Sequence, residues 1–369
     1  MGDAAFATPE GTSAYAARIR SAGMSDVPRG FDGLILSSVG LGTYLGAHDT
    51  VTDRIYEAAV TRAWALGCNV IDTAINYRCQ RSERAIGRAL AAAIAAGAIR
   101  RDQVVLATKG GYIHYDGEPP SDPAAYFRQT FVTPGLVAPQ DVVAGSHSLA
   151  PTFLQHQLDR SLVNLNVSCI DLYYLHNPET QLEEVPADRF HGRMRAAFEL
   201  LERNVEAGKI RCYGVATWNG LRASPGAGSL ISLEALVALA RHIAGERHHF
   251  RAVQLPYSLA MPEASTRTNQ TVKGVAMTPL EAAAALGLYA IGSAALYQSR
   301  LAQNLPPEIR RRLTGLETDA QRAIQFVRST PGFGTALVGM KQVGHVEENL
   351  KTLAVPPLSP ADVTRLLAN

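Results

Sequence analysis

The chain has 369 residues, 47% of them hydrophobic and 18% charged, so it can bury a large core as one α/β domain with insertions or as two domains. Its formal net charge of +2, without a basic cluster, lacks the electrostatic signature of nucleic-acid binding and favours a small-molecule partner. The sequence shows no run of 18 apolar residues, and its first residues show no basic flank before an apolar segment. We therefore expect no membrane span, no signal peptide and a cytoplasmic location.

The cysteines and histidines predict neither a disulfide framework nor a metal site. The four cysteines are widely spaced and form no CxxC pair, which favours reduced thiols; they are Cys68, Cys79, Cys169 and Cys212. No set of His, Cys and carboxylate residues has the spacing of metal ligands.

From residue 31 onward, short apolar runs alternate with amphipathic stretches. The runs are rich in Val, Ile, Leu and Tyr and too short for ordinary helices, which is typical of buried parallel strands. Eight strands are predicted, at 38–43, 69–74, 104–110, 169–176, 211–217, 252–258, 288–295 and 335–340. Helical patterns occupy about 53–67, 81–97, 151–166, 188–208, 231–245, 278–287, 317–329 and 345–353.

This alternation predicts a (β/α)8 TIM barrel over residues 31–369, preceded by an N-terminal extension at 1–30. A doubly wound sheet is the rival, but no GxGxxG follows the first strand. The longest interruption, 111–150, follows the third strand, so we interpret it as a lid or substrate loop, with a surface insertion or oligomer contact as the alternative. Both a monomer and a homo-oligomer are compatible with such a barrel.

Four polar residues stand at or just beyond the ends of three predicted strands: Asp72, Tyr77, Lys109 and His176. Because the carboxyl ends of parallel strands meet at one rim of a barrel, we expect these side chains to lie together.

The order of these motifs resembles the aldo-keto reductase superfamily. The resemblance is carried by SVGLGT, GCNVIDTAINY with RSERAIGRAL, VVLATKG, CIDLYYLH, YGVATW, VQLPYS and TALVGMKQVGHVEENL. It implies a (β/α)8 barrel, a nicotinamide cofactor, usually NADPH, and reversible reduction of aldehydes or ketones. It also implies that Asp72, Tyr77, Lys109 and His176 are the catalytic residues.

The chemistry of these four residues is consistent with that role. Hydride transfer to a carbonyl carbon builds negative charge on its oxygen, so a nearby donor such as Tyr77 must supply a proton. The ammonium of Lys109 would favour the ionised phenol, and Asp72 would keep the lysine charged. His176 would orient the carbonyl by donating a hydrogen bond.

The resemblance also assigns cofactor and substrate contacts. Gln254 matches the amide that binds the nicotinamide carboxamide, Thr217 stands where a Ser and Asn pair is usual, and Lys341 would receive a 2′-phosphate. The full predicted cofactor set is Gly42, Thr43, Thr217, Gln254, Ser293, Leu296, Lys341, His345, Glu348 and Asn349. Tyr44, Tyr112 and Trp218 are the expected substrate walls. NADP(H) is therefore the predicted cofactor and NAD(H) the alternative.

The predicted function is NAD(P)H-dependent oxidoreduction of an aldehyde, ketone or sugar hemiacetal, with Tyr77 as general acid and base. Two alternatives stay open at this point. One is a sugar lactol dehydrogenase that works in the oxidative direction. The other is a non-catalytic nucleotide-binding regulatory or scaffold protein.

Overall fold

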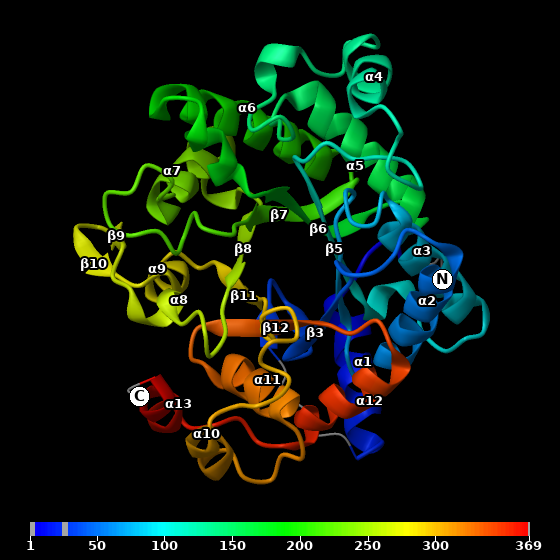
Figure 1. The fold of residues 1–369 in the computed structure, drawn as a ribbon, viewed down its shortest axis with the longest axis vertical. Coiled ribbons are helices and arrows are strands. Elements are labelled where there is room, and N and C mark those ends of the chain that lie inside the picture. Colours follow the sequence, from blue (N-terminus) through cyan, green and yellow to red (C-terminus); the bar gives the residue numbers. More distant parts are fainter. Residues whose placement is uncertain (1–3, 24–28, 368–369) are drawn as a thin grey trace.

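Eight parallel strands close into a barrel in the computed structural model, which describes residues 4–23 and 29–367 (Figure 1). The strands follow one another around the ring in chain order, and the last pairs with the first to close it. They are β3 (Val39–Gly42), β4 (Val70–Asp72), β5 (Val105–Gly110), β6 (Ile170–His176), β7 (Ile210–Ala216), β8 (Phe250–Pro256), β11 (Tyr289–Ser293) and β12 (Phe333–Gly339). The predicted (β/α)8 TIM barrel is confirmed, with all eight strands in their expected places.

Helices surround the barrel and bury their apolar faces against it. The helices that follow the barrel strands are α2 (Thr50–Ala65), α3 (Arg81–Ala95), α5 (Pro151–Leu165), α6 (Ala187–Glu206), α7 (Leu233–Ala244), α9 (Pro279–Ala285), α11 (Asp319–Ser329) and α12 (Val343–Leu350). Gly67, Gly208 and Gly287 take left-handed φ values of 97°, 71° and 71° just after helices α2, α6 and α9, as expected of C-terminal caps.

The inside of the barrel changes from apolar to polar along each strand. On β5, the inward-facing Val105 and Ala107 pack with Val70 and Leu172 of the neighbouring strands. Alternate residues of a strand share a face, so Lys109 continues the same side at the strand's carboxyl end. The apolar layers therefore form a floor beneath a polar rim.

A hairpin closes the opposite end of the barrel. It consists of β1 (Arg29–Phe31) and β2 (Leu34–Leu36), joined by Asp32 and Gly33 with φ values of 48° and 83°. Two positive φ values in a two-residue loop are the requirement of a type I′ turn. Phe31, Leu34 and Leu36 pack into the same cluster as the inward-facing barrel residues, so the hairpin plugs the barrel floor.

Helix α1 (Pro9–Ser21) belongs to the expected N-terminal extension and packs on the barrel's outer layer. The hydroxyl of Tyr15 donates to the backbone oxygen of Trp64 over 2.6 Å. Gly11 approaches η1 (Arg101–Gln103) so closely that an added Cβ would lie 2.2 Å from the Asp102 oxygen. Residues 1–3 and 24–28 of this extension, and 368–369 of the predicted barrel domain, lie outside the described residues.

The 111–150 insertion folds around a small core of its own. Phe131 and Val137 pack with Phe153 of α5, and α4 lies at the edge of the molecule, away from the barrel axis (Figure 1). The insertion contains α4 (Pro123–Phe127), a π-helical turn η2 (Arg128–Val132) and η3 (Pro139–Asp141). The remaining elements are η4 (Pro178–Glu183), η5 (Gly245–Arg247), α8 (Glu263–Thr266), β9 (Gln270–Val272), β10 (Val275–Met277), α10 (Pro307–Arg312), η6 (Lys351–Ala354) and α13 (Pro360–Leu367). Among helices in the described ranges, none has the length and apolar character needed to cross a bilayer.

Candidate active site

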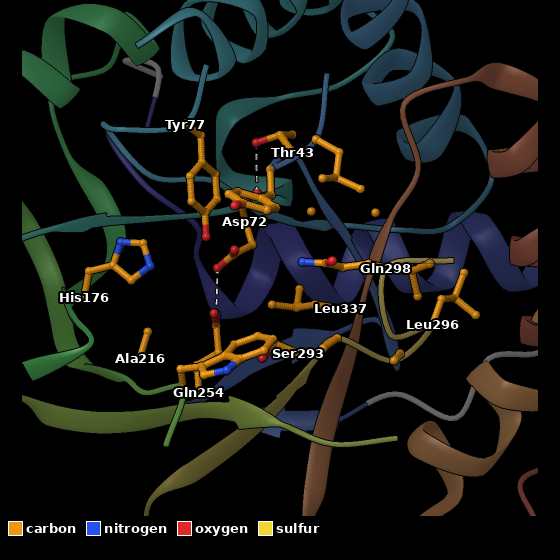
Figure 2. Close-up of a pocket in the computed structure, with 18 of the residues that line it drawn as sticks. Thr43, Asp72, Tyr77, His176, Ala216, Gln254, Ser293, Leu296, Gln298 and Leu337 are labelled. Carbon is orange, nitrogen blue, oxygen red and sulfur yellow. Dashed lines mark hydrogen bonds between the residues drawn. The ribbon is translucent and has the colours of Figure 1, made fainter. Parts of the chain in front are cut away.

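A cavity of about 570 Å³ opens at the carboxyl ends of the strands, and residues at or after all eight barrel strands line it (Figure 2). From the predicted catalytic set it contains Asp72, Tyr77 and His176. From the predicted cofactor and substrate sets it contains Gly42, Thr43, Tyr44, Tyr112, Thr217, Trp218, Gln254, Ser293 and Leu296. Tyr112 is the one residue of the 111–150 insertion among those that line it.

Lys109 lies beneath the cavity floor and is 1% exposed. Its Nζ donates to Asp72 Oδ1 over 2.5 Å and to the Thr73 backbone oxygen over 2.8 Å. Burial acts against the ammonium, but the adjacent Asp72 carboxylate and the Tyr77 phenol outweigh it and raise the pKa of Lys109. The lysine is therefore held as a buried cation. The second oxygen of Asp72 accepts a hydrogen bond from Gln254 Nε2 over 2.8 Å, as Figure 2 shows.

The phenol of Tyr77 points towards Asp72, one member of this buried pair (Figure 2). Its Oη lies 3.5 Å from Lys109 Nζ, and the ammonium lies 5.0 Å from the ring centre. Burial raises the pKa of Tyr77, whereas Lys109 lowers it, and burial is the larger effect. The lysine thus acts in the expected direction, but the phenol remains protonated at neutral pH. A protonated phenol is ready to act as an acid.

His176 stands beside Tyr77, with the two ring centres 5.8 Å apart and the rings edge to face. Burial, together with Lys109 and His147, lowers the pKa of His176 well below its ordinary value, so the imidazole is neutral. Its Nδ1 is buried and has no hydrogen-bond partner among the residues that the structure describes. Because an unpaired buried N–H donor is costly, the proton is favoured on Nε2. A neutral imidazole in this tautomer can donate one hydrogen bond from Nε2.

His147, which is not among the predicted site residues, supports His176 through its backbone. Its Nε2 lies 2.7 Å from the His176 backbone oxygen, and its Nδ1 lies 2.7 Å from the Gln181 amide. Burial lowers the pKa of His147 to about 4, so the ring is neutral and its two nitrogens serve as one donor and one acceptor. No sequence signal marks this role, because the partner of His147 is a backbone carbonyl at the end of β6, 29 residues further along the chain.

Two asparagines were also missed, although each adjoins a predicted catalytic residue. Asn76 precedes Tyr77, Asn177 follows His176, and both line the cavity. The amide of Asn177 donates to the Tyr112 hydroxyl over 3.1 Å. Adjacency to a catalytic candidate was the available signal, and it was not used.

Four predicted cofactor residues lie beyond the cavity, in the loop after β12 and on α12. They are the half-buried Lys341, the exposed His345, the half-buried Glu348 and the buried Asn349. Gly339 at the end of β12 does line the cavity, so this segment continues from its edge.

Two loops at the rim adopt an unusual backbone. Residues 78–80 have φ values of 49°, 55° and 68°, and residues 297–299 have φ values of 45°, 51° and 70°, with no glycine in either run. Such left-handed φ values are costly for residues other than glycine and persist only when the surrounding structure fixes them. Arg78 is fixed by an ion pair of 2.7 Å with Asp53 and a bond of 2.8 Å to the Ala47 backbone oxygen.

Comparison with known proteins identifies the family. The model of the aldo/keto reductase family matches residues 38–368. The chain belongs to the aldo/keto reductase family. The NADP(+) aldo-keto reductase yakc of Schizosaccharomyces pombe is 29% identical over 167 residues, which is 45% of this chain and 37% of that protein. Two further curated relatives are each matched over 49% of their length, so the chain's match spans half or less of these relatives.

Solved structures of aldo/keto reductases share the fold. The enzyme of Klebsiella pneumoniae in complex with NADP and acetate has a TM-score of 0.61 at 21% identity, with 93% of this chain and 94% of that one covered. The holo form of an aldo-keto reductase from Bacillus halodurans has a TM-score of 0.62 at 18% identity, with 93% and 96% covered. Among the described side chains of this family member, no group of His, Cys, Asp and Glu is arranged to hold a metal ion.

Proposed function

We propose that this protein reduces an uncharged aldehyde, ketone or open-chain sugar, with NADPH as preferred cofactor and NADH as the alternative. The observation that carries the proposal is the buried Lys109 cation, held by Asp72 and in contact with a protonated Tyr77 beside the neutral His176. Family membership supports it, as does the NADP(+) in the name of the yeast relative.

The residues at the cavity fit a nicotinamide cofactor. Gly42 and Gly339 leave one side free of side chains: a Cβ at Gly339 would meet nothing within 4 Å, and one at Gly42 would make only ordinary contacts from 3.8 Å. Thr217, Gln254 and Ser293 supply polar groups at strand ends. When bound, the cofactor supplies the hydride. Thr43 and Leu296 would complete its surroundings, and Lys341, His345, Glu348 and Asn349 would receive the adenosine end.

Tyr77 would give its proton to the carbonyl oxygen as negative charge develops there. His176 would hold that oxygen by donating from Nε2, and its neutrality leaves the role of acid to the phenol. The Lys109 ammonium would stabilise the phenolate left behind, and Asp72 keeps the ammonium charged and in place. In the oxidative direction, as for a sugar lactol, Tyr77 would act as base only at alkaline pH, because its pKa is raised by burial.

The charge of the cavity indicates an uncharged substrate. Asp72 is the one carboxylate among the described lining residues, its charge is balanced by Lys109, and no lysine or arginine lines the cavity. A carboxylate or phosphate on the substrate would therefore lose hydration without gaining a counter-charge. Tyr44, Tyr112 and Trp218 offer aromatic faces. Together with the amides of Asn76 and Asn177, these surfaces suit a hydroxyl-bearing carbonyl compound.

Nucleotide titration and a Tyr77→Phe variant test the proposal. NADPH should quench protein fluorescence in both proteins, whereas Tyr77→Phe should lose about 100-fold or more in the rate of carbonyl reduction, the usual weight of a general acid. Tyr126→Phe is the matched control, because Tyr126 packs in the 111–150 insertion and does not line the cavity. Binding of neither nucleotide would refute the reductase proposal. An unchanged rate of reduction in Tyr77→Phe would refute Tyr77 as the general acid. Normal nucleotide binding without carbonyl reduction by either protein would favour a non-catalytic nucleotide-binding role instead.

A further inference from the structure

We propose that Glu179 is a positioning residue, whose carboxylate holds the loop after β7 so that Trp218 forms a fixed wall of the substrate cavity. The geometry of the loop carries this inference independently of activity. Its kinetic test rests on the function proposed above, whereas its spectroscopic test does not.

The carboxylate of Glu179 accepts hydrogen bonds from three consecutive backbone N–H groups. Its Oε1 accepts from the amides of Trp218, Asn219 and Gly220 over 2.6, 2.9 and 3.1 Å. Glu179 is 5% exposed, and no ion pair to it occurs among the described basic side chains. A buried carboxylate is costly unless it is hydrogen-bonded, so these converging amides stabilise Oε1. Its Oε2 is buried with no partner among the described groups, and burial raises the pKa of Glu179. Carboxylate and loop therefore hold each other in place.

Gly220 shows that the loop is built for this close approach. An added Cβ at Gly220 would lie 3.1 Å from Glu179 Cβ and 3.2 Å from Glu179 Cδ. A side chain at this position would push the loop away from the carboxylate. Gly220 and Glu179 therefore contact each other directly, although they are 41 positions apart in the sequence.

Glu179 connects two loops that border the cavity. It lies in η4, three residues after His176, and the same segment holds Asn177, whose backbone N–H donates to the Ala216 oxygen over 2.6 Å. Trp218 is 40% exposed, so burial alone does little to fix it. Its neighbour Thr217 is held separately, because its N–H donates to the Gln254 oxygen over 2.8 Å. Loss of the carboxylate should therefore free Trp218 and leave Thr217 in place.

The first test compares Glu179→Met, which removes the acceptor but keeps an unbranched chain, with Glu179→Gln, which keeps an acceptor oxygen. Loss of a hydrogen bond to a charged group should raise KM for the carbonyl substrate about tenfold in Glu179→Met, with kcat and NADPH affinity changed far less. In Glu179→Gln, KM for the carbonyl substrate should stay close to the wild-type value. Glu202→Met is the matched control, because Glu202 is a buried acceptor for Tyr213 and His249, neither of which lines the cavity.

The second test observes Trp218 directly by 19F NMR of protein labelled with 5-fluorotryptophan. The chain has two tryptophans, and the buried Trp64 on α2 provides an internal reference. Glu179→Met should shift or broaden the Trp218 resonance and leave that of Trp64 unchanged. Gly220→Ala should produce the same change with the carboxylate intact, which keeps the test valid if Glu179→Met does not fold.

A folded Glu179→Met with wild-type KM and a wild-type Trp218 resonance would overturn the inference. The inference also fails if Glu202→Met raises KM as much as Glu179→Met does. A protein without reductase activity in which both variants still move the Trp218 resonance would refute the proposed function and leave the role of Glu179 intact.

Discussion

The buried pair of Asp72 and Lys109 leads to a quantitative prediction for Asp72→Asn. The substitution keeps the shape of the side chain but removes the charge that Lys109 Nζ contacts over 2.5 Å. Both side chains are almost fully buried, with 6% and 1% of their surface exposed. Breaking a buried ion pair by removing one partner costs about 3–5 kcal/mol, since the other charge is left uncompensated. We expect a deficit of this size in the free energy of unfolding at pH 7.

The deficit should shrink as the pH rises. In the wild type the pKa of Lys109 is raised, because Asp72 and Tyr77 outweigh burial, so its contribution is complete below the ordinary lysine pKa and is lost only above the folded value. In Asp72→Asn only the Tyr77 phenol is left to oppose burial, so the pKa of Lys109 should fall below that of the unfolded chain. Deprotonating a lysine of ordinary pKa costs about 4.6 kcal/mol at pH 7 and about 1.2 kcal/mol at pH 9.5. The penalty is therefore relieved by about 3 kcal/mol over this range.

Urea unfolding of both proteins at pH 7 and pH 9.5, followed by circular dichroism, measures this change. The matched control is Asp171→Asn, which breaks the 2.7 Å buried pair of Asp171 and Arg101. A guanidinium does not deprotonate in this range, so the control deficit should be the same at both pH values. An Asp72→Asn deficit that stays constant between pH 7 and 9.5 would refute the assignment of Lys109 as a cation held by Asp72.

Three further predictions concern pH, cofactor choice and stability. Because burial holds the pKa of Tyr77 above and that of His176 well below their ordinary values, the rate of reduction should be flat from pH 6 to 8 and fall only at alkaline pH; an inflection near 6.5 would contradict a neutral His176. Lys341→Ala should weaken NADPH binding about tenfold, which corresponds to the loss of one charged hydrogen bond, and leave NADH binding unchanged. Equal losses of affinity for both nucleotides in calorimetric titrations would show that Lys341 does not bind the 2′-phosphate. Gly11→Ala should destabilise the protein by about 1–3 kcal/mol through overpacking, whereas Gly344→Ala, a helical glycine with open space, should stabilise it by about 0.5–1 kcal/mol; thermal unfolding of the two variants decides.

The barrel was predictable because its strands have a recognisable sequence pattern. The run 104–110, for example, is apolar to Ala107 and turns polar at Thr108 and Lys109, which reflects a strand buried on both faces that reaches the rim. Because the carboxyl ends of parallel strands meet at one rim, the same pattern predicted that Asp72, Tyr77 and His176 lie together, and all three line one cavity. The hairpin at Asp32 and Gly33 carried a usable signal as well, since an Asp-Gly pair between apolar residues is typical of a type I′ turn. It was overlooked because its strands are only three residues long and precede the first predicted strand at residue 38.

Other features had no signal in a single sequence. Glu179 and His147 contact backbone groups that are distant along the chain, and a backbone amide or carbonyl leaves no residue type to recognise. The direction of the Tyr77 pKa likewise depends on how far burial exceeds the attraction of Lys109, which only the packed structure reveals. Helix α1 was missed for a related reason, since just four of its residues are buried and its apolar pattern is weak.

The hairpin at the barrel floor has a consequence for the traffic of molecules through the site. With Phe31 and Leu34 packed into the lower end, the cavity formed by the described residues opens at the rim that Tyr44 and Trp218 border. Any molecule that binds in the cavity of about 570 Å³ therefore enters and leaves at the same face of the barrel. The hairpin thus confines all exchange of ligands to the carboxyl ends of the strands.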